Sequence, residues 1–447
     1  MWTILIPFFL AEGLYFTVKT NWFPITKMRL WMKMTIGSLF CEDIRKREEG
    51  AEASQLQSIC TVLAATIGTG NMAGVATAIT AGGPGAIFWM WVSAFFGMML
   101  TYAENVLGIC YRYRDEEGKW IGGPMIYMER GCHRRWMAVI FSFLCIFVSI
   151  GMGNMTQINS AASVLESAFH IPLPVTGVAA AVIVGIIFIG GSEQILRVTE
   201  RIVPIMAAAF FTATFLALWF HRTDIPEAFH LIIKEAFTVK ASVSGVAGYG
   251  IGVAMKKGIA RGVFTNEAGL GSSVLVNAVA DVTEPVQQGM WAIFAVFFDT
   301  LVMCTLTALT ILTSGVYNKN IYQSAIISGQ IGHLPDGAVL TGKAFAASFG
   351  IKGEWFVAVC IVCFAFATIL AWSYYGEKTA NYLFGAKSSN IYKLIFLAAL
   401  FAGSQMNLRI VWELSDLWNA MMAIPNLAAV AYLSKDVIKA TRAYIDG

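Results

Sequence analysis

Long apolar runs alternate with short polar segments along almost the whole chain. A bilayer core about 30 Å thick needs ~20 apolar residues in a helix. Runs of this kind fall near residues 2–19, 55–80, 84–110, 136–166, 172–191, 199–220, 242–256, 286–314, 350–375, 391–406 and 411–433. The pattern therefore predicts an all-α integral membrane protein with about eleven transmembrane helices.

Composition agrees with a membrane setting. Of the 447 residues, 57% are hydrophobic and 13% are charged, whereas soluble chains carry about 25% charged residues. Membrane lipid is therefore the expected surrounding. A net charge of +3 gives no reason to expect a nucleic-acid partner, and no obligate protein partner is evident. The five His residues form no cluster with Cys or Glu at metal-ligand spacing, which argues against a membrane enzyme.

The distribution of Lys and Arg predicts an orientation. Cytoplasmic loops carry an excess of basic residues. Placing segments 20–54, 111–135, 192–198, 256–285, 376–390 and 434–447 on one side collects 21 basic residues there and leaves 7 on the other. We therefore predict a multi-pass protein of the inner or plasma membrane, with its N-terminus outside and its C-terminus in the cytosol.

The second apolar run is interrupted at mid-depth by Gly68-Thr-Gly-Asn71. Gly costs about 1 kcal/mol in a helix interior, and Asn competes with the backbone for hydrogen bonds. The pattern predicts a helix break in the middle of the bilayer. Irregular backbone is tolerated there only where it lines a polar cavity, so the break is a candidate binding site.

The seventh run is short and carries Gly at positions 245, 248, 250 and 252, which predicts a second break. Broken helices at matching places in two halves indicate an inverted-repeat transporter. The predicted division is an extra N-terminal span with a cytosolic loop (1–54), a first five-helix repeat (55–220), a second, inverted one (221–433) and a cytosolic tail (434–447). Tight packing is the alternative explanation of the second Gly-rich run.

In the fourth span, Asn154, Gln157 and Ser160 are spaced to share one helical face. For Asn154, a hydrogen bond between helices is as good an explanation as substrate contact; for Gln157 we favour substrate contact. In the ninth span, Thr368 and Trp372 share one helix face. Thr368 offers a hydroxyl to an ion or substrate, unless it bonds to its own helix, and Trp372 offers an apolar wall.

Asp299, in the eighth span, is the clearest ionisable residue well inside an apolar run. It is either part of an ion site or a structural partner of nearby polar groups. Glu104 is expected to pair with Arg112 near the inner end of the third span. The segment 262–273 reads as a loop in which Thr265 or Asn266 caps a helix, with an inner gate as one possible role.

Three motifs resemble the alanine or glycine:cation (sodium) symporter family. They are Ala64-Ala-Thr-Ile-Gly-Thr-Gly-Asn-Met-Ala-Gly-Val75, Gly122-Gly-Pro-Met-Ile-Tyr-Met-Glu-Arg-Gly131 and Ile259-Ala-Arg-Gly-Val-Phe-Thr-Asn-Glu-Ala-Gly-Leu-Gly-Ser272. The resemblance runs from about residue 50 to 430. It implies a LeuT-type five-plus-five fold with one extra N-terminal span, and sodium-coupled symport of alanine or glycine by alternating access.

The resemblance also implies roles for particular residues. The implied substrate-binding residues are Thr69, Gly70, Asn71, Gln157, Thr368 and Trp372. The implied sodium site consists of the carbonyls of Ala64 and Ile67 with Thr368, and the sodium ion is co-transported. Sodium symporters of this fold often carry two adjacent hydroxyls where this chain has Ala367-Thr368. Proton coupling is therefore an alternative to sodium coupling, and glutamine is an alternative substrate. A channel would need a filter motif, and none is present.

Overall fold

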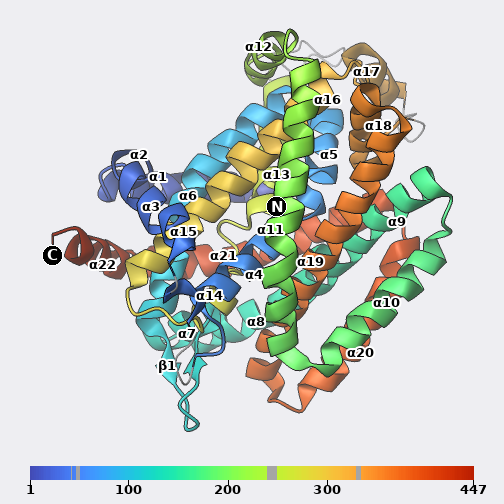
Figure 1. The fold of residues 1–447 in the computed structure, drawn as a ribbon. Coiled ribbons are helices and arrows are strands. Elements are labelled where there is room, and N and C mark those ends of the chain that lie inside the picture. Colours follow the sequence, from blue (N-terminus) through green and yellow to red (C-terminus); the bar gives the residue numbers. More distant parts are fainter. Residues whose placement is uncertain (42, 47–50, 239–248, 329–333, 447) are drawn as a thin grey trace.

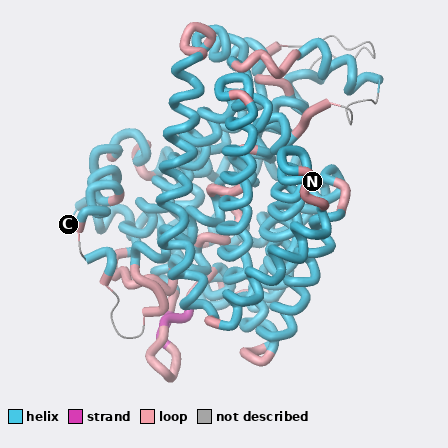
Figure 2. The backbone as a smooth tube through the Cα atoms, turned by 45° about the vertical axis from the view of Figure 1, so that its right-hand side comes forward, coloured by secondary structure: helices cyan, strands magenta, loops and turns pink. Residues whose placement is uncertain are grey.

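The computed structural model describes residues 1–41, 43–46, 51–238, 249–328 and 334–446. Helices account for most of this part of the chain, as Figure 2 shows. They pack side by side into one bundle with buried apolar side chains throughout its interior (Figure 1).

Most of the predicted spans are helices with bounds close to those expected. They are α1 (Trp2–Lys19), α4 (Gln55–Thr66) with α5 (Ala73–Gly82), α6 (Gly85–Tyr111), α8 (Arg135–Ile150) with α9 (Thr156–Phe169), α10 (Leu173–Ile189), α11 (Gly191–Phe220), α15 (Pro285–Val296) with α16 (Thr305–Thr313), α19 (Ile351–Phe384), α20 (Ser388–Gln405) and α21 (Leu408–Tyr432). In the described part, six helices are long and apolar enough to cross a membrane, counting α8–α9 and α15–α16 as continuous helices.

Shorter elements occupy the segments between these helices. They are α2 (Phe23–Thr26), α3 (Met28–Met34), η1 (Ile36–Phe40), η2 (Asp43–Arg45), β1 (Tyr113–Arg114), β2 (Trp120–Ile121), α7 (Pro124–Ile126), η4 (Tyr127–Gly131), α12 (Ile225–Ala236), α17 (Lys319–Ser328), α18 (Gly337–Phe349) and α22 (Ser434–Asp446). The antiparallel hairpin β1–β2 lies at one end of the bundle, and α12, α17 and α18 lie at the other (Figure 1).

The predicted break in the second span is confirmed. Helix α4 begins at a capping box, in which Ser54 and Gln57 satisfy each other's backbone amides. It ends at Thr66, and the short turn η3 (Thr69–Asn71) separates it from α5. Figure 1 shows α4 and α5 one after the other between the hairpin end and the α12 end of the bundle, so the two pieces form one interrupted span.

The second break lies elsewhere than predicted. Gly245 and Gly248 lie outside the described residues, whereas Gly250 and Gly252 belong to α13 (Tyr249–Asn266), which is continuous. The irregular segment follows α13 at residues 267–273, before the short helix α14 (Val274–Asn277). At Gly250 and Gly252 the prediction is wrong, because α13 runs through both, whereas Glu267, Gly269 and Gly271 adopt positive φ just after its end.

This correction changes the expected loops. The segment 256–261 is helical, and Gly82, at the turn between α5 and α6, lies against the Lys257 side chain. The part of α13 that carries Lys256, Lys257 and Arg261 therefore lies on the α12 side of the breaks, and moving these three residues changes the basic bias to 18 to 10. The predicted loop 192–198 is also helical, as part of α11.

Candidate substrate and ion site

The first break exposes backbone groups that a regular helix would use internally. Gly68 is extended, and a Cβ there would lie 2.5 Å from Thr368 Oγ1. At Gly70 a Cβ would lie 2.7 Å from the methyl group of Thr265. The two glycines thus let the break approach α19 on one side and α13 on the other. No larger residue fits at either position without a shift.

Gln157 contacts this break directly. Its amide oxygen accepts from the Thr69 backbone N–H at 3.1 Å and from the Thr69 hydroxyl at 2.8 Å. Its amide nitrogen donates to the carbonyl of Met152 at 3.0 Å. Met152 belongs to η5 (Gly151–Met155), a π-helical segment between α8 and α9. Such π-segments occur frequently at functional sites.

Asn71 links the break to the eighth span. Its side-chain nitrogen donates to Asp299 Oδ1 at 2.6 Å, and its side-chain oxygen accepts from the Gly68 backbone N–H at 3.0 Å. Asp299 lies in a second π-helical segment, η6 (Phe297–Cys304), and its other oxygen accepts from Thr300 at 2.8 Å. The carboxylate is fully buried. The structure thus brings Asp299 into the candidate site.

The last turn of α13 lies against the first break at Gly70, and the second break that follows it contributes a residue that the sequence reasoning missed. Glu267 is 2% exposed, and its carboxylate accepts from the indole N–H of Trp372 at 2.8 Å and from Ser272. Asn266 ends α13, where its side chain accepts from the Ala268 backbone N–H and donates to Thr300. The predicted helix-start cap at Thr265 or Asn266 is therefore wrong. Gly269 and Gly271, so close to Glu267, were the available signal of a break.

Thr368 bonds across the bundle rather than to its own helix. Its hydroxyl donates to the carbonyl of Ala64 over 2.7 Å. Ala64 lies in the last turn of α4, and Ile67 follows where the helix ends. Oxygen atoms of α19 and of the end of α4 therefore meet at one buried position. The Ile67 and Thr368 side chains are likewise buried.

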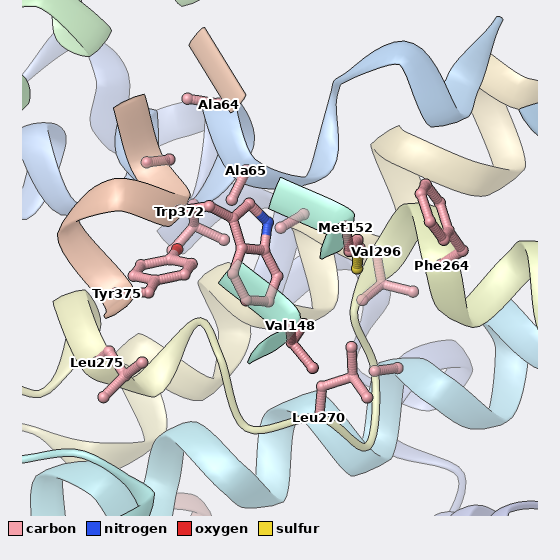
Figure 3. Packing of buried hydrophobic residues seen from close by; sticks show 14 of the residues in the cluster. Ala64, Ala65, Val148, Met152, Phe264, Leu270, Leu275, Val296, Trp372 and Tyr375 are labelled. Carbon is pink, nitrogen blue, oxygen red and sulfur yellow. The ribbon is translucent and has the colours of Figure 1, made fainter. Parts of the chain in front are cut away.

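Trp372 forms an apolar wall beside this position. Figure 3 shows its indole at the centre of a cluster that includes Ala65, Val148, Met152 and Tyr375. The rings of Trp372 and Tyr375 meet edge to face at 5.3 Å. Gly153 in η5 lies so close to Trp372 that a Cβ would clash with it. The wall is therefore held in place from both α19 and the fourth span.

Three other sequence predictions have definite outcomes. Asn154 donates to the carbonyl of Phe396 at 2.7 Å, which is the interhelical bond offered as one explanation. Ser160 donates to the carbonyl of Thr156 in its own helix. Glu104 does not pair with Arg112, because eight residues of helix separate them by about 12 Å along the axis. Glu104 accepts from Asn426 instead.

Interactions close the bundle on both sides of the two breaks. At the α12 end, Arg261 and Asp416 form a two-bond ion pair at 2.9 and 3.0 Å, with Trp412 stacked on the guanidinium. At the hairpin end, Arg112 donates to the carbonyls of Ala278 and Ala280 at 3.1 and 2.7 Å. An apolar groove among α4, α11 and α15 has no site residue in its lining except Ile67.

Two broken helices that meet beside buried polar groups define a secondary transporter of the LeuT type. The fold agrees with MhsT, solved in complex with L-phenylalanine, at a TM-score of 0.60 and 12% identity, over 87% of this chain and 90% of that one. The chain belongs to the sodium:alanine symporter family, whose model matches residues 1–447.

Two relatives illustrate the range of this family. The chain is 38% identical to the sodium/alanine symporter AgcS of Methanococcus maripaludis, over 97% of this chain and 92% of AgcS. It is 34% identical to the probable sodium/glutamine symporter GlnT of Bacillus subtilis, over 99% of this chain and 88% of GlnT. The predictions of family, fold class and transport rather than enzymatic activity are thereby confirmed. The count of eleven spans, the orientation of the termini and the repeat boundaries stay predictions.

Proposed function

We propose that this protein carries a small neutral amino acid, alanine or glycine, together with sodium, by alternating access. The observation that carries the proposal is the pair of hydrogen bonds from Thr69 to the amide oxygen of Gln157. At the start of a helical segment, this one oxygen accepts hydrogen bonds from both the backbone N–H and the hydroxyl of Thr69. A substrate carboxylate is an acceptor of the same kind and is further favoured by the positive end of a helix dipole.

The other substrate contacts follow from the same arrangement. Gly70 and Asn71 continue the polar edge of the break, and Gln157 faces it from the fourth span. Thr368 and Trp372 come from α19 on the remaining side. We infer that these five residues, together with Thr69, surround the amino acid. The clash of a Cβ at Gly153 with Trp372 supports a small substrate, because the wall has little room to retreat.

We infer that sodium binds between α4 and α19. Unwound carbonyls at the end of a half-helix are suited to this ion. The carbonyl of Ala64 and the hydroxyl of Thr368 already meet at 2.7 Å, and the carbonyl of Ile67 follows at the helix end. A sodium ion at this position would order the break, which would favour binding of the substrate carboxylate next to it.

Asp299 supports a second coupling candidate. Its carboxylate is fully buried, and its partners in the described hydrogen bonds, Asn71 and Thr300, are neutral. Such a carboxylate is suited to bind a cation or a proton. Proton coupling through this carboxylate remains the alternative to sodium coupling. Glutamine remains the alternative substrate, since the relative GlnT is described as a probable sodium/glutamine symporter.

The deciding experiment is uptake of labelled alanine, glycine and glutamine into proteoliposomes that contain the purified protein. We expect alanine or glycine to accumulate when a sodium gradient is imposed and not when potassium replaces sodium. Uptake driven by a pH gradient and indifferent to sodium would overturn the coupling. Accumulation of glutamine alone would overturn the substrate assignment.

A further inference from the structure

One buried amide in the bundle has no hydrogen-bond partner at either of its polar atoms. Asn419 in α21 is fully buried, and neither its Oδ1 nor its Nδ2 is bonded within the described residues. Other buried amides are used: Asn159 donates to the carbonyls of Gly403 and Met406 at 2.9 and 2.7 Å. Burying an amide without partners is costly, so an amide of this kind indicates a ligand.

Helix geometry places Asn419 beside the candidate substrate site. Residues at spacings of three, four and seven share one face of a helix, and Trp412, Ser415, Asn419 and Asn426 follow this spacing. Ser415 bonds Thr156, the neighbour of Gln157, at 2.8 Å. Asn426 donates to the carbonyl of Gly269 in the second break at 2.9 Å. Asn419 therefore lies between the level of Gln157 and the level of the second break, on the face directed at both.

The contacts of Trp412, at the other end of this face, also place the face of α21 toward the breaks. Trp412 stacks on Phe264 in α13, with ring centroids 4.5 Å apart, and approaches Gly74 at the start of α5. Gly151 in η5 packs against Trp418 and Ser415. Thus α21 contacts the start of α5 just after the first break, the second break, and the π-helical segment of the fourth span, and Asn419 lies between these contacts.

We propose that Asn419 is a substrate-binding residue that recognises the charged α-amino and α-carboxyl groups of the transported amino acid. Its oxygen accepts from the α-ammonium group, and its nitrogen donates to the carboxylate whose other oxygen is held by Thr69. A side-chain amide carries a donor group, its NH₂, beside an acceptor group, its carbonyl oxygen, which matches the two charged groups of an α-amino acid. This inference rests on the proposed function, since it requires that the cargo is an amino acid.

The test compares Asn419→Leu with Asn159→Leu in the purified full-length protein. Alanine binding is measured by isothermal titration calorimetry in sodium buffer, and thermal stability is measured without ligand. Asn419→Leu is expected to weaken alanine binding at least tenfold and to keep or raise the melting temperature, because it removes an amide that has no partner. Asn159→Leu loses two hydrogen bonds and is expected to lower the melting temperature and leave alanine affinity within twofold.

Binding of a second ligand, propionate, tests whether Asn419 contacts the ammonium group of the substrate. Propionate has the carboxylate of alanine but lacks its ammonium group. The wild-type protein is expected to prefer alanine over propionate, and Asn419→Leu is expected to reduce that preference at least tenfold. If Leu at this position prevents folding, Asn419→Ala supports the same comparison.

The outcomes separate this inference from the proposed function. If the wild-type protein binds no amino acid, the proposed function fails. If the wild type binds alanine and both Asn419 variants bind it equally well, Asn419 is not a substrate-binding residue. A fall in melting temperature in Asn419→Leu with unchanged alanine affinity would show that water satisfies the amide, and would likewise overturn the inference.

Discussion

The side-chain nitrogen of Asn71 lies 2.6 Å from Oδ1 of Asp299, and this contact joins the first helix break to the eighth span. The same nitrogen lies 3.1 Å from the Asp299 carbonyl oxygen. Both residues are fully buried. A change at Asp299 is therefore transmitted directly to the backbone of the break, because Asn71 also accepts from the N–H of Gly68.

Asp299→Asn removes the negative charge and keeps the shape of the side chain. If the carboxylate attracts the coupling ion, the sodium concentration for half-maximal uptake should rise at least tenfold, which is about 1.4 kcal/mol. Sodium dependence of alanine uptake in proteoliposomes measures this. Thr300→Val is the matched control, since it removes the other donor to Asp299 without changing charge. Equal sodium dependence in wild type and Asp299→Asn would identify Asp299 as a structural partner only.

Thr368→Val replaces a hydroxyl by a methyl group of similar volume at the proposed sodium site. The carbonyl of Ala64 then loses its 2.7 Å donor, and the ion loses one oxygen ligand. We expect the half-maximal sodium concentration to rise tenfold or more, with about 1–3 kcal/mol of stability lost through the unsatisfied carbonyl.

Thr368→Ser keeps the hydroxyl and is expected to retain sodium dependence close to that of the wild type. Sodium titration of uptake and thermal unfolding of both variants separate the two effects. A Val variant that is destabilised yet titrates with sodium normally would remove Thr368 from the ion site.

The sequence pattern located the first break but not the second. Gly68, Gly70 and Asn71 combine two weak helix formers with an amide at the centre of an apolar run. The Gly residues near position 250 gave a stronger compositional signal than Gly269 and Gly271. Helix α13 nevertheless runs through Gly250 and Gly252, because packing overrides propensity. Glu267 in the left-handed region then ends it, a backbone state that a sequence does not reveal.

The partners of the site residues also required the structure. Gln157 and Thr368 were recognisable as polar groups at depth, but their contacts with Thr69 and Ala64 span 88 and 304 residues of sequence. Glu267 and Asn419 were missed for different reasons. Glu267 follows a Thr-Asn pair that looks like a loop, and Asn419 becomes notable only when its lack of hydrogen bonds is known.

Trp372→Phe shortens the apolar wall and removes the indole donor to Glu267. The added space should admit larger side chains, so uptake of glutamine relative to alanine should rise severalfold. Competition of unlabelled glutamine against labelled alanine uptake measures the change. Trp355→Phe on the same helix is the control, because Trp355 is 44% exposed and stacks on Phe169 away from the site. An unchanged preference in Trp372→Phe would show that another residue sets the size limit.

Gly153→Ala tests how rigidly the wall is held. The new methyl group would clash with the Cβ and ring of Trp372, so either α19 or η5 has to move. Overpacking of this kind costs about 1–3 kcal/mol, and displacement of Trp372 should reduce alanine uptake at least tenfold.

Gly252→Ala in α13 is the matched control, since no atom lies within 4 Å of its Cβ position. That variant should keep full uptake and gain up to about 1 kcal/mol from higher helix propensity. Thermal unfolding and uptake of both variants decide the matter, and equal behaviour of the two would mean that the contact between Gly153 and Trp372 does not constrain the site.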